Sequence, residues 1–435
     1  MGRNSKLTAG VAGNRENFFL EKGSIKKKWK NRVPIALIYP NFYSLGMSNL
    51  GFQLVYHLLN QDDRIVAERV FLPELNNKPL SVESGRTLSD FPFLFFSVSF
   101  EQDYQNLIMM LELAGISSLT TDRSKKGQDI SAQAAGGQPL VVAGGVATFM
   151  NPEPLAPFID LFFIGEAEPV LPPLVAHLTD GIGKNKTRLL IKIASELTGC
   201  YIPAFYQPVY DTDGKLLSIG PNAEYPSLPD RIKKVVLESP GEFASHSKIL
   251  SPTAEFSNLF MTELGRGCSR GCRFCAAGFI YRPPRLWKAQ SIINAIDSRP
   301  DGCSRIGLLG MEMAQPNDVS LIADYLADKS CSLSFSSLRA DIISSSLTEL
   351  LGQSNLKSVA IAPDGGSERL RQVINKGITE IDVLTAVEIL AQKGIKNLKL
   401  YYMIGLPTET QADLDEMVNL IMKVKGIILD IGRTK

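Results

Sequence analysis

Three cysteines lie close together in the stretch Glu263-Leu-Gly-Arg-Gly-Cys268-Ser-Arg-Gly-Cys272-Arg-Phe-Cys275. Their CxxxCxxC spacing brings three thiolates together on one tight loop, enough to hold three irons of a 4Fe-4S cube. The usual cluster of an electron carrier is held by four cysteines, one for each iron. A three-cysteine loop leaves the fourth iron open and therefore predicts an enzyme that loads a molecule onto the exposed metal.

Two other roles for these cysteines need different sequence contexts. A structural zinc site normally takes four ligands in closely spaced pairs, whereas Cys200, Cys303 and Cys331 are isolated and the three histidines lie far off in the sequence. Structural disulfides belong to oxidising compartments, and no feature of the chain indicates one. Zinc and disulfides are the alternatives to the iron-sulfur cluster.

The cysteine stretch resembles the signature of the radical S-adenosylmethionine (SAM) enzymes, CxxxCxΦC, with Phe274 as the aromatic residue before the last cysteine. The resemblance implies that Cys268, Cys272 and Cys275 bind the cluster and that the open iron chelates the amino and carboxylate groups of SAM. An electron from the cluster would then split the sulfonium to give a 5'-deoxyadenosyl radical. An external electron donor of the flavodoxin or ferredoxin type is implied as a partner.

Strands and helices alternate from residue 257 onward, as in a parallel barrel whose functional residues lie at the carboxyl ends of the strands. A sixth strand is indicated by the β-branched residues of Gly426–Ile431, but in related chains this region resembles the end of a helix. We expect residues 257–435 to form a partial (β/α) TIM-like radical SAM barrel, truncated before its last strand. Its expected strands are Leu259–Glu263, Arg305–Leu309, Leu333–Phe335, Ser358–Ile361 and Leu398–Met403.

Four residues after these strands match positions at which the family binds SAM. Glu312 ends a stretch that resembles the family's Gly-Gly-Glu, which receives the methionine amino group, and a carboxylate suits an ammonium. Ser336 and Arg339 stand where the family contacts ribose and carboxylate, and a guanidinium binds a carboxylate through two hydrogen bonds. Gly405 follows the fifth strand, where the family's backbone borders the adenine.

The first half of the chain also alternates apolar runs with helical patterns. This alternation predicts an α/β fold with an N-terminal doubly wound parallel sheet, whose ligands bind beyond the carboxyl ends of the strands. We expect a basic polar segment at 1–30, the sheet domain at 31–182 and a linker with one hairpin at 183–256. The expected strands are Pro34–Tyr39, Phe93–Val98, Leu140–Ala143 and Leu161–Ile164, and helices are expected at Gly46–Asn60 and Tyr104–Ala114.

The strand ends of this sheet resemble those of the cobalamin-binding domains that precede many radical SAM modules. Ser97 and Ser99 follow one strand and Gly144 and Gly145 the next; glycines there let the backbone approach a bulky ligand. Many cobalamin domains carry Asp-x-His-x-x-Gly after the first strand, but this chain has a tyrosine, Tyr43, in place of the histidine that binds cobalt. Bound cobalamin would therefore lack a protein histidine ligand. A domain used for packing or for another ligand is the alternative.

Composition and charge limit the classes of partner. Lys and Arg number 46 against 45 Asp and Glu, a net charge of +1, so no overall field indicates nucleic acid or an anionic membrane. We interpret the patch Lys26–Lys30 as a solvated basic segment. No apolar run approaches the length of about 20 residues that a membrane helix needs, and the N-terminus lacks a signal-peptide pattern. We expect a cytoplasmic protein with no membrane partner.

The sequence leaves three functional classes open. The first is a radical SAM enzyme that removes hydrogen from an unactivated position, with methyl transfer as a second step if cobalamin is bound. The second is a non-catalytic iron-sulfur or scaffold relative, which gains support from Met311 in the Gly-Gly-Glu stretch. The third is a methylthiotransferase-like RNA-modifying enzyme, which normally needs a second cluster. No pattern in the sequence indicates the substrate.

Overall fold

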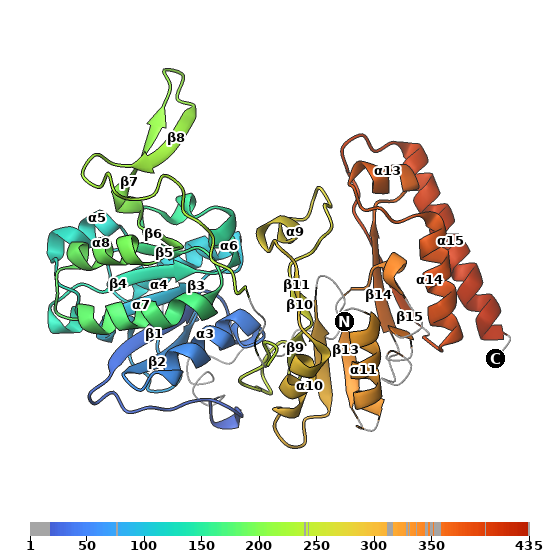
Figure 1. Ribbon diagram of the computed structural model, residues 1–435, viewed down its shortest axis with the longest axis horizontal. Coiled ribbons are helices and arrows are strands. Elements are labelled where there is room, and N and C mark those ends of the chain that lie inside the picture. Colours follow the sequence, from blue (N-terminus) through green and yellow to red (C-terminus); the bar gives the residue numbers. More distant parts are fainter. Residues whose placement is uncertain are drawn as a thin grey trace. The chain divides into compact units, whose positions relative to one another are not determined.

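The chain folds into two compact units. The first is made of Met1–Leu237 with Ser247–Asn258, and the second of Glu238–His246 with Leu259–Lys435. Each unit contains parallel strands and helices (Figure 1). The structure, a computed structural model, describes residues 18–74, 77–238, 241, 243–310, 316–327, 329, 331–335, 337–343, 347–348, 351, 358–395 and 397–433.

A six-stranded sheet in the order β2-β1-β3-β4-β5-β6 forms the centre of the first unit. Neighbouring strands are parallel except for β5 and β6. The strand order reverses between β1 and β3, so their carboxyl ends form the switch point at which doubly wound sheets bind ligands. The elements are β1 (Val33–Tyr39), α2 (Tyr43–Gly46), α3 (Leu50–Gln61), β2 (Ile65–Phe71), β3 (Phe93–Ser97), α4 (Tyr104–Leu113), α5 (Thr120–Lys126), β4 (Leu140–Gly144), α6 (Val146–Met150), β5 (Leu161–Phe163), α7 (Ala167–Gly181), α8 (Lys186–Glu196), β6 (Cys200–Tyr201), β7 (Tyr206–Tyr210) and β8 (Leu216–Pro221).

Alternate residues of β1 enter two separate cores. Ile35 and Leu37 belong to a cluster with side chains of α3, α7 and α8, whereas Ala36 and Ile38 belong to a cluster with side chains of α4 and α6 (Figure 1). Successive side chains of a strand point to opposite faces of its sheet, so helices cover both faces. The predicted doubly wound α/β fold is confirmed.

Two elements near the start of this sheet differ from the sequence expectation. The helix expected from Gly46 begins at Leu50, because the side chain of Asn49 accepts a hydrogen bond of 2.9 Å from the N–H of Phe52 and caps the helix there. Strand β2 was not expected, because Glu68 and Arg69 interrupt its apolar pattern. Both charged side chains are buried, so the charges are part of the core of the unit.

Most of the segment 183–256, expected to be a linker, lies in the first unit. The Nζ of Lys186, the first residue of α8, lies 3.0 Å from the buried Asp160 carboxylate just before β5. Strand β6 then pairs antiparallel with β5. The expected hairpin is present as β7 and β8, with Asp211 accepting N–H bonds from Asp213 and Lys215 in the turn.

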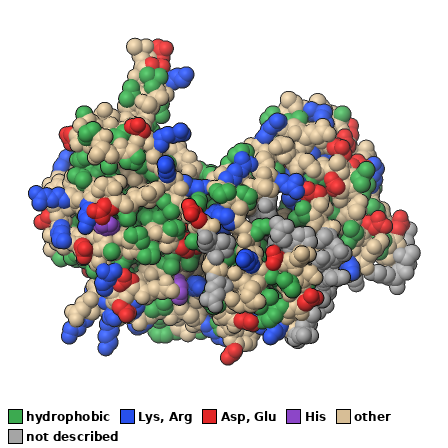
Figure 2. All heavy atoms as spheres, in the orientation of Figure 1, with side chains coloured by type: hydrophobic (Ala, Val, Ile, Leu, Met, Phe, Trp, Pro, Cys, Tyr) green, Lys and Arg blue, Asp and Glu red, His purple; other side chains and the backbone are tan. Residues whose placement is uncertain are grey.

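The basic segment near the N-terminus is partly anchored to the sheet instead of being fully solvated. The Nζ of Lys27 donates hydrogen bonds to three backbone oxygens around the end of α3 and the start of β2. The indole N–H of Trp29 donates to Glu68 at 2.6 Å. On the face shown in Figure 2, basic and acidic side chains are interspersed, as the net charge of +1 suggests.

Among its described residues, the second unit carries five strands that run parallel to their neighbours in two sheets. Strands β9, β12 and β13 form one sheet and β14 and β15 another, and a parallel bridge between Leu338 and Ile361 links the segment after β13 to β14. All five expected strands are confirmed. The elements are β9 (Phe260–Glu263), β10 (Gly265–Arg266), α9 (Ala277–Ile280), β11 (Arg285–Leu286), α10 (Ala289–Asp297), β12 (Arg305–Leu309), α11 (Pro316–Ala327), β13 (Ser332–Phe335), β14 (Ser358–Asp364), α13 (Glu368–Val373), α14 (Glu380–Gln392), β15 (Asn397–Tyr402) and α15 (Gln411–Arg433).

The last helix answers the question that the sequence left open about a sixth strand. Gly426–Ile431 is helical and lies within α15. Among the helices that the structure describes, none is both long enough and apolar enough to cross a membrane.

Candidate functional site

The three clustered cysteines lie on a loop that directly follows β9. The loop is closed at its base by the antiparallel pair β10 and β11, where Gly265 pairs with Leu286 (Figure 1). Gly267 enters the loop with a φ of +88°, and a Cβ there would lie 2.3 Å from the backbone oxygen of Tyr281. Because only glycine tolerates both the conformation and the close approach, Gly267 allows the loop to close on itself.

None of the three cysteines forms a disulfide, and Cys272 is the buried one. The backbone N–H of Arg270 is directed at the sulfur of Cys268, and that of Gly278 at the sulfur of Cys275, each at 3.4 Å. Hydrogen bonds to the charged form of a group favour that form, and bonds to the sulfurs tune an iron-sulfur cluster. The loop therefore provides main-chain donors suited to thiolate ligands.

A single metal ion and a cube make different demands on such a loop. Within the described residues, no three His, Cys, Asp or Glu side chains converge closely enough to hold one metal ion. A single tetrahedral zinc needs its sulfur ligands about 2.3 Å from one point, whereas each cysteine of a cube binds a separate iron. The cube implied by the cysteine motif calls for the second arrangement, with one thiolate on each of three irons.

The segment after α13 holds the cysteine loop in place. The N–H of Arg273 donates to the backbone oxygen of Ile374 at 2.9 Å, and the side-chain amide of Asn375 donates to the backbone oxygen of Gly271 at 2.8 Å. Asn375 has a φ of +53°, a conformation that asparagine tolerates better than most residues. These bonds connect the loop to a part of the chain about a hundred residues away.

A lysine of the same segment lies against the aromatic residue of the cysteine motif. The Nζ of Lys376 is 5.8 Å from the centre of the Phe274 ring and 2.5 Å from the carboxylate of Asp364 at the end of β14. Asp364 has a φ of +65°, a strained conformation for a residue with a side chain. The motif's aromatic ring therefore contacts a charge pair anchored at a strand end, which the cysteine spacing does not reveal.

Arg339 is brought close to the cysteines, as the resemblance implied for a cofactor-binding residue. Burial alone would lower the pKa of Arg339, but Asp341, to which it donates two bonds of 3.0 Å, and the nearby Cys272 and Cys268 raise it. A further bond of 2.9 Å runs to the backbone oxygen of Lys376. Arg339 is therefore held by Asp341 and by the backbone of Lys376, the residue that lies against Phe274 of the cysteine motif.

The other predicted SAM-binding positions divide into two kinds. Gly405, just after β15, has a φ of +76°, and a Cβ there would meet no atom within 4 Å. The backbone at this strand end therefore borders open space, as contact with a flat ring requires. Glu312 and Ser336 lie outside the described residues. At the start of the last helix, the backbone N–H and the hydroxyl of Thr410 both donate to Asp413.

The predicted residues of the first unit lie together at the carboxyl edge of its sheet. Ser97 ends β3 and is paired with Gly144, which ends β4. Ser99 accepts a bond of 3.1 Å from Asn49. Gly145 has a φ of +110°, and a Cβ there would lie 2.4 Å from the backbone oxygen of Val98. The contact between two strand ends is one reason for a glycine at 145. Binding of a ligand by Gly145 stays a prediction.

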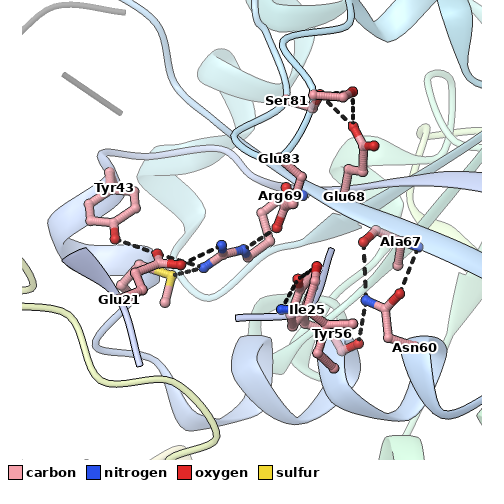
Figure 3. A network of polar contacts seen from close by, with 12 residues as sticks. Glu21, Ile25, Tyr43, Tyr56, Asn60, Ala67, Glu68, Arg69, Ser81 and Glu83 are labelled. Atoms are coloured by element: carbon pink, nitrogen blue, oxygen red, sulfur yellow. Dashed lines mark hydrogen bonds and ion pairs between the residues drawn. The ribbon is translucent and has the colours of Figure 1, made fainter. Parts of the chain in front are cut away.

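Tyr43, in place of the family's histidine, points into the protein. Its hydroxyl donates to Glu21 at 2.5 Å (Figure 3). The same hydroxyl lies 2.9 Å from that of Ser251. Glu21 in turn binds the buried Arg69, which Glu83 contacts from the other side. Burial raises the pKa of Tyr43 well above its ordinary value. The tyrosine is a structural residue of this charge network and does not project from the sheet edge.

Asp103 lies at the switch point and was not predicted as a site residue. Its Oδ1 accepts a bond of 2.6 Å from the side-chain amide of Asn41, which follows β1. Its Oδ2 is buried and has no hydrogen-bond partner among the described residues. Burial raises the pKa of this carboxyl. No sequence signal marks Asp103, because its partner lies far away in the chain.

Exposed apolar side chains follow the carboxyl ends of several strands of this sheet. Phe42 and Leu45 follow β1, Phe100 follows β3, and Met150 ends the helix after β4; Phe42 and Phe100 are more than half exposed. We call these four residues the apolar rim. Exposed apolar groups gathered at one end of a fold mark ligand or protein contacts. The carboxyl edge thus combines an apolar rim with an unsatisfied buried oxygen.

Two family models match the chain, and both describe the same kind of protein. One, radical SAM proteins, N-terminal, matches residues 51–203, and the other, the radical SAM superfamily, matches residues 262–421. Residues 262–421 thus form a radical SAM domain, and residues 51–203 match the N-terminal part of radical SAM proteins. The second match includes the cysteine loop and all the strand ends described in the second unit of this radical SAM protein.

One curated protein and several solved structures also resemble the chain. An uncharacterized protein of Methanocaldococcus jannaschii is 28% identical over 396 residues, 90% of this chain and 74% of that protein. The structure of the cobalamin-dependent SAM radical enzyme OxsB with aqua-cobalamin bound matches with a TM-score of 0.58 and 16% identity, over 89% of this chain and 52% of OxsB. The radical SAM protein thus spans about half the length of OxsB.

A second solved structure covers more of the matching protein. It is the radical SAM methyltransferase TsrM from Kitasatospora setae with cobalamin and a [4Fe-4S] cluster bound, with a TM-score of 0.57 and 14% identity, over 91% of this chain and 70% of TsrM. At these identities the likeness is one of fold. The doubly wound sheet and the radical SAM core thus occur in the same order in cobalamin-dependent enzymes.

Proposed function

We propose that this radical SAM protein reductively cleaves SAM at a 4Fe-4S cluster held by Cys268, Cys272 and Cys275, and uses the resulting 5'-deoxyadenosyl radical to remove hydrogen from an unreactive position of its substrate. The observation that carries the proposal is the loop of three cysteines that form no disulfide, closed by β10 and β11, with main-chain N–H groups directed at two of the sulfurs. When bound, the cluster would supply the electron and an open coordination position for SAM.

The surrounding residues of the second unit have separate tasks in this reaction. Arg339 offers a fixed guanidinium to the SAM carboxylate, and Asp341 orients it. Gly405 leaves open space beside the backbone for the adenine, while Ser336 contacts the ribose and Glu312 receives the amino group. Since fixed dipoles and charges cost no reorganisation during the reaction, the rigidly held loop and Arg339 favour cleavage of bound SAM.

The first unit is proposed to bind cobalamin at its carboxyl edge, with methyl transfer to the substrate radical as a second step. The edge fits such a ligand because the apolar rim can contact a large ring and Asp103 keeps an unused acceptor oxygen there. Ser97, Ser99 and Gly144 line the strand ends. Tyr43 is buried in the charge network, so no protein histidine or tyrosine at that position would bind the cobalt. When bound, cobalamin would supply the methyl carrier.

The reaction also needs an electron from outside the protein. We assign this task to a flavodoxin or ferredoxin. In the test, dithionite replaces that partner: anaerobically reconstituted protein is incubated with SAM and dithionite, and 5'-deoxyadenosine is measured by mass spectrometry. We expect formation by the wild type and by Cys303→Ala, whose cysteine lies outside the loop, and none by Cys272→Ala. Equal product from wild type and Cys272→Ala would overturn the proposal.

A further inference from the structure

Buried carboxylates in the first unit differ in how completely they are bonded. Glu68 accepts bonds from Trp29, Ser81 and Ser84. Asp160 binds Arg123, Lys186 and a backbone N–H. Asp103, which is only 1% exposed, has Asn41 as the donor to one oxygen and no partner for the other among the described residues.

An unsatisfied buried oxygen is costly to keep. Leaving a buried acceptor unpaired costs about 1–3 kcal/mol, and more when the group is charged. Asp103 has no positively charged partner in the described part of the chain, and the neighbouring Tyr39 has its pKa raised, chiefly by burial and in part by this carboxylate. Such a cost is retained at sites where a ligand supplies the missing donor.

The position of Asp103 indicates where that ligand lies. Asn41 follows β1 and Asp103 ends the short turn after β3, so the pair bridges the two strands between which the sheet order reverses. Phe42 is bonded through its N–H to the Oδ1 of Asn41, and Phe100 begins the turn that carries Asp103. Two members of the apolar rim are thus joined to the pair by the backbone.

We propose that the Oδ2 of Asp103 accepts a hydrogen bond from a peripheral primary amide of a corrinoid bound at this edge. This inference rests on the proposed cobalamin binding and names the residue that recognises the amide. The carboxylate is covered in the ligand-free chain, so the atoms that cover its Oδ2 must move when the amide binds. Phe42 and Phe100, which are more than half exposed, lie close in sequence to Asn41 and Asp103.

A change of Asp103 to asparagine turns this acceptor into a donor. The Oδ1 of Asn41 is held by the N–H of Phe42, so the Nδ2 of Asn41 must keep donating to residue 103. The oxygen of the new amide would accept that bond, and its NH₂ would then take the place of the Oδ2. Asp103→Asn therefore keeps the contact with Asn41 and presents a hydrogen-bond donor to the ligand in place of an acceptor.

The test is titration of wild type, Asp103→Asn and the control Glu101→Gln with hydroxocobalamin and with cobalamin derivatives in which a single peripheral amide is hydrolysed to a carboxylate. Glu101 is an exposed residue of the same turn. Binding is followed by absorption and equilibrium dialysis. We expect Asp103→Asn to bind hydroxocobalamin about tenfold more weakly, since bonds to charged groups contribute about 1.5–3 kcal/mol and 1.4 kcal/mol is tenfold. One carboxylate derivative should bind Asp103→Asn more tightly than it binds wild type.

The outcomes separate this inference from the proposed function. If wild type retains no corrinoid, both fall. If wild type binds hydroxocobalamin and Asp103→Asn binds it equally, with no preference for any carboxylate derivative, the inference falls and cobalamin binding stands. A loss of affinity in Asp103→Asn that is accompanied by a lower unfolding midpoint of the ligand-free protein would show a structural residue and would also overturn the inference.

Discussion

Two groups of buried charged residues in the first unit differ in how completely they are hydrogen-bonded. The guanidinium of Arg69 binds the carboxylates of Glu21 and Glu83 at 2.7 Å each, and Glu21 also accepts a hydrogen bond from Tyr43 (Figure 3). At Asp103, the carboxylate has one neutral partner and one oxygen with none among the described residues. We call the first group the closed cluster and the second the open pair.

The contrast shows that the number of hydrogen-bond partners of a buried charged group distinguishes a structural role from a binding role more clearly than its burial does. Arg69 and Asp103 are both almost completely buried. In the closed cluster, burial alone would lower the pKa of Arg69, but Glu83 and Glu21 raise it well above its ordinary value. In the open pair, burial raises the pKa of Asp103, and the hydrogen bond from Asn41 opposes this rise. The closed cluster stabilises the fold, whereas the open pair costs stability and is suited to a ligand.

The largest effect is expected from opening the closed cluster. Glu83→Ala leaves a guanidinium edge of Arg69 buried without its carboxylate, which should lower the free energy of unfolding by about 3–5 kcal/mol. Denaturant unfolding of the ligand-free protein measures it. Glu101→Ala, at an exposed carboxylate of the same unit, should stay within about 0.5 kcal/mol of wild type. A loss for Glu83→Ala no greater than that of the control would refute the scaffold role.

A smaller effect is expected at the edge of the closed cluster. Tyr43→Phe removes the hydroxyl that bonds Glu21 and Ser251 and should cost about 1.5 kcal/mol, since Glu21 keeps the bonds from Arg69. The absorption spectrum and affinity of bound hydroxocobalamin should not change. A changed spectrum at unchanged stability would place Tyr43 in contact with the corrinoid and contradict its assignment to the cluster.

The smallest effect concerns the open pair and its pH dependence. Burial raises the pKa of Asp103 in the folded protein, so the folded state favours the protonated carboxyl and this stabilisation is complete below the unfolded value of about 3.9. It is lost as the pH rises through the folded-state pKa. As the pH rises through that pKa, the unfolding free energy of ligand-free wild type should therefore fall relative to that of Asp103→Asn. The fall should be smaller than the loss of unfolding free energy caused by Tyr43→Phe. A difference in unfolding free energy that does not change with pH would contradict the open pair.

The sequence predicted the second unit better than the binding edge of the first, and for a physical reason. The predicted cluster ligands lie close together in the sequence, at Cys268, Cys272 and Cys275. Their spacing alone therefore indicates the cluster. The segment at Asn375 and Lys376, which holds the loop, and Asp103, which faces Asn41, act through contacts between distant parts of the chain. Such contacts leave no local pattern.

Strand β2 shows the same limit in the fold. Apolar runs predicted β1, β3, β4 and β5 because buried parallel strands are nearly continuous in hydrophobic residues. Strand β2 could not be predicted because it contains the charged residues Glu68 and Arg69. Their burial depends on partners that the local sequence does not contain. Gly145 was predicted as a site residue by its type, and its backbone contact with Val98 is one reason for the glycine.

The most direct test of the account is electron paramagnetic resonance of the reduced, anaerobically reconstituted protein with and without SAM. An iron that no cysteine holds is open to SAM, so we predict a 4Fe-4S signal whose shape changes when SAM is added, and no such signal from Cys272→Ala. A reduced 4Fe-4S signal that stays the same in the presence of SAM would contradict the central claim that the three-cysteine loop leaves an iron for SAM.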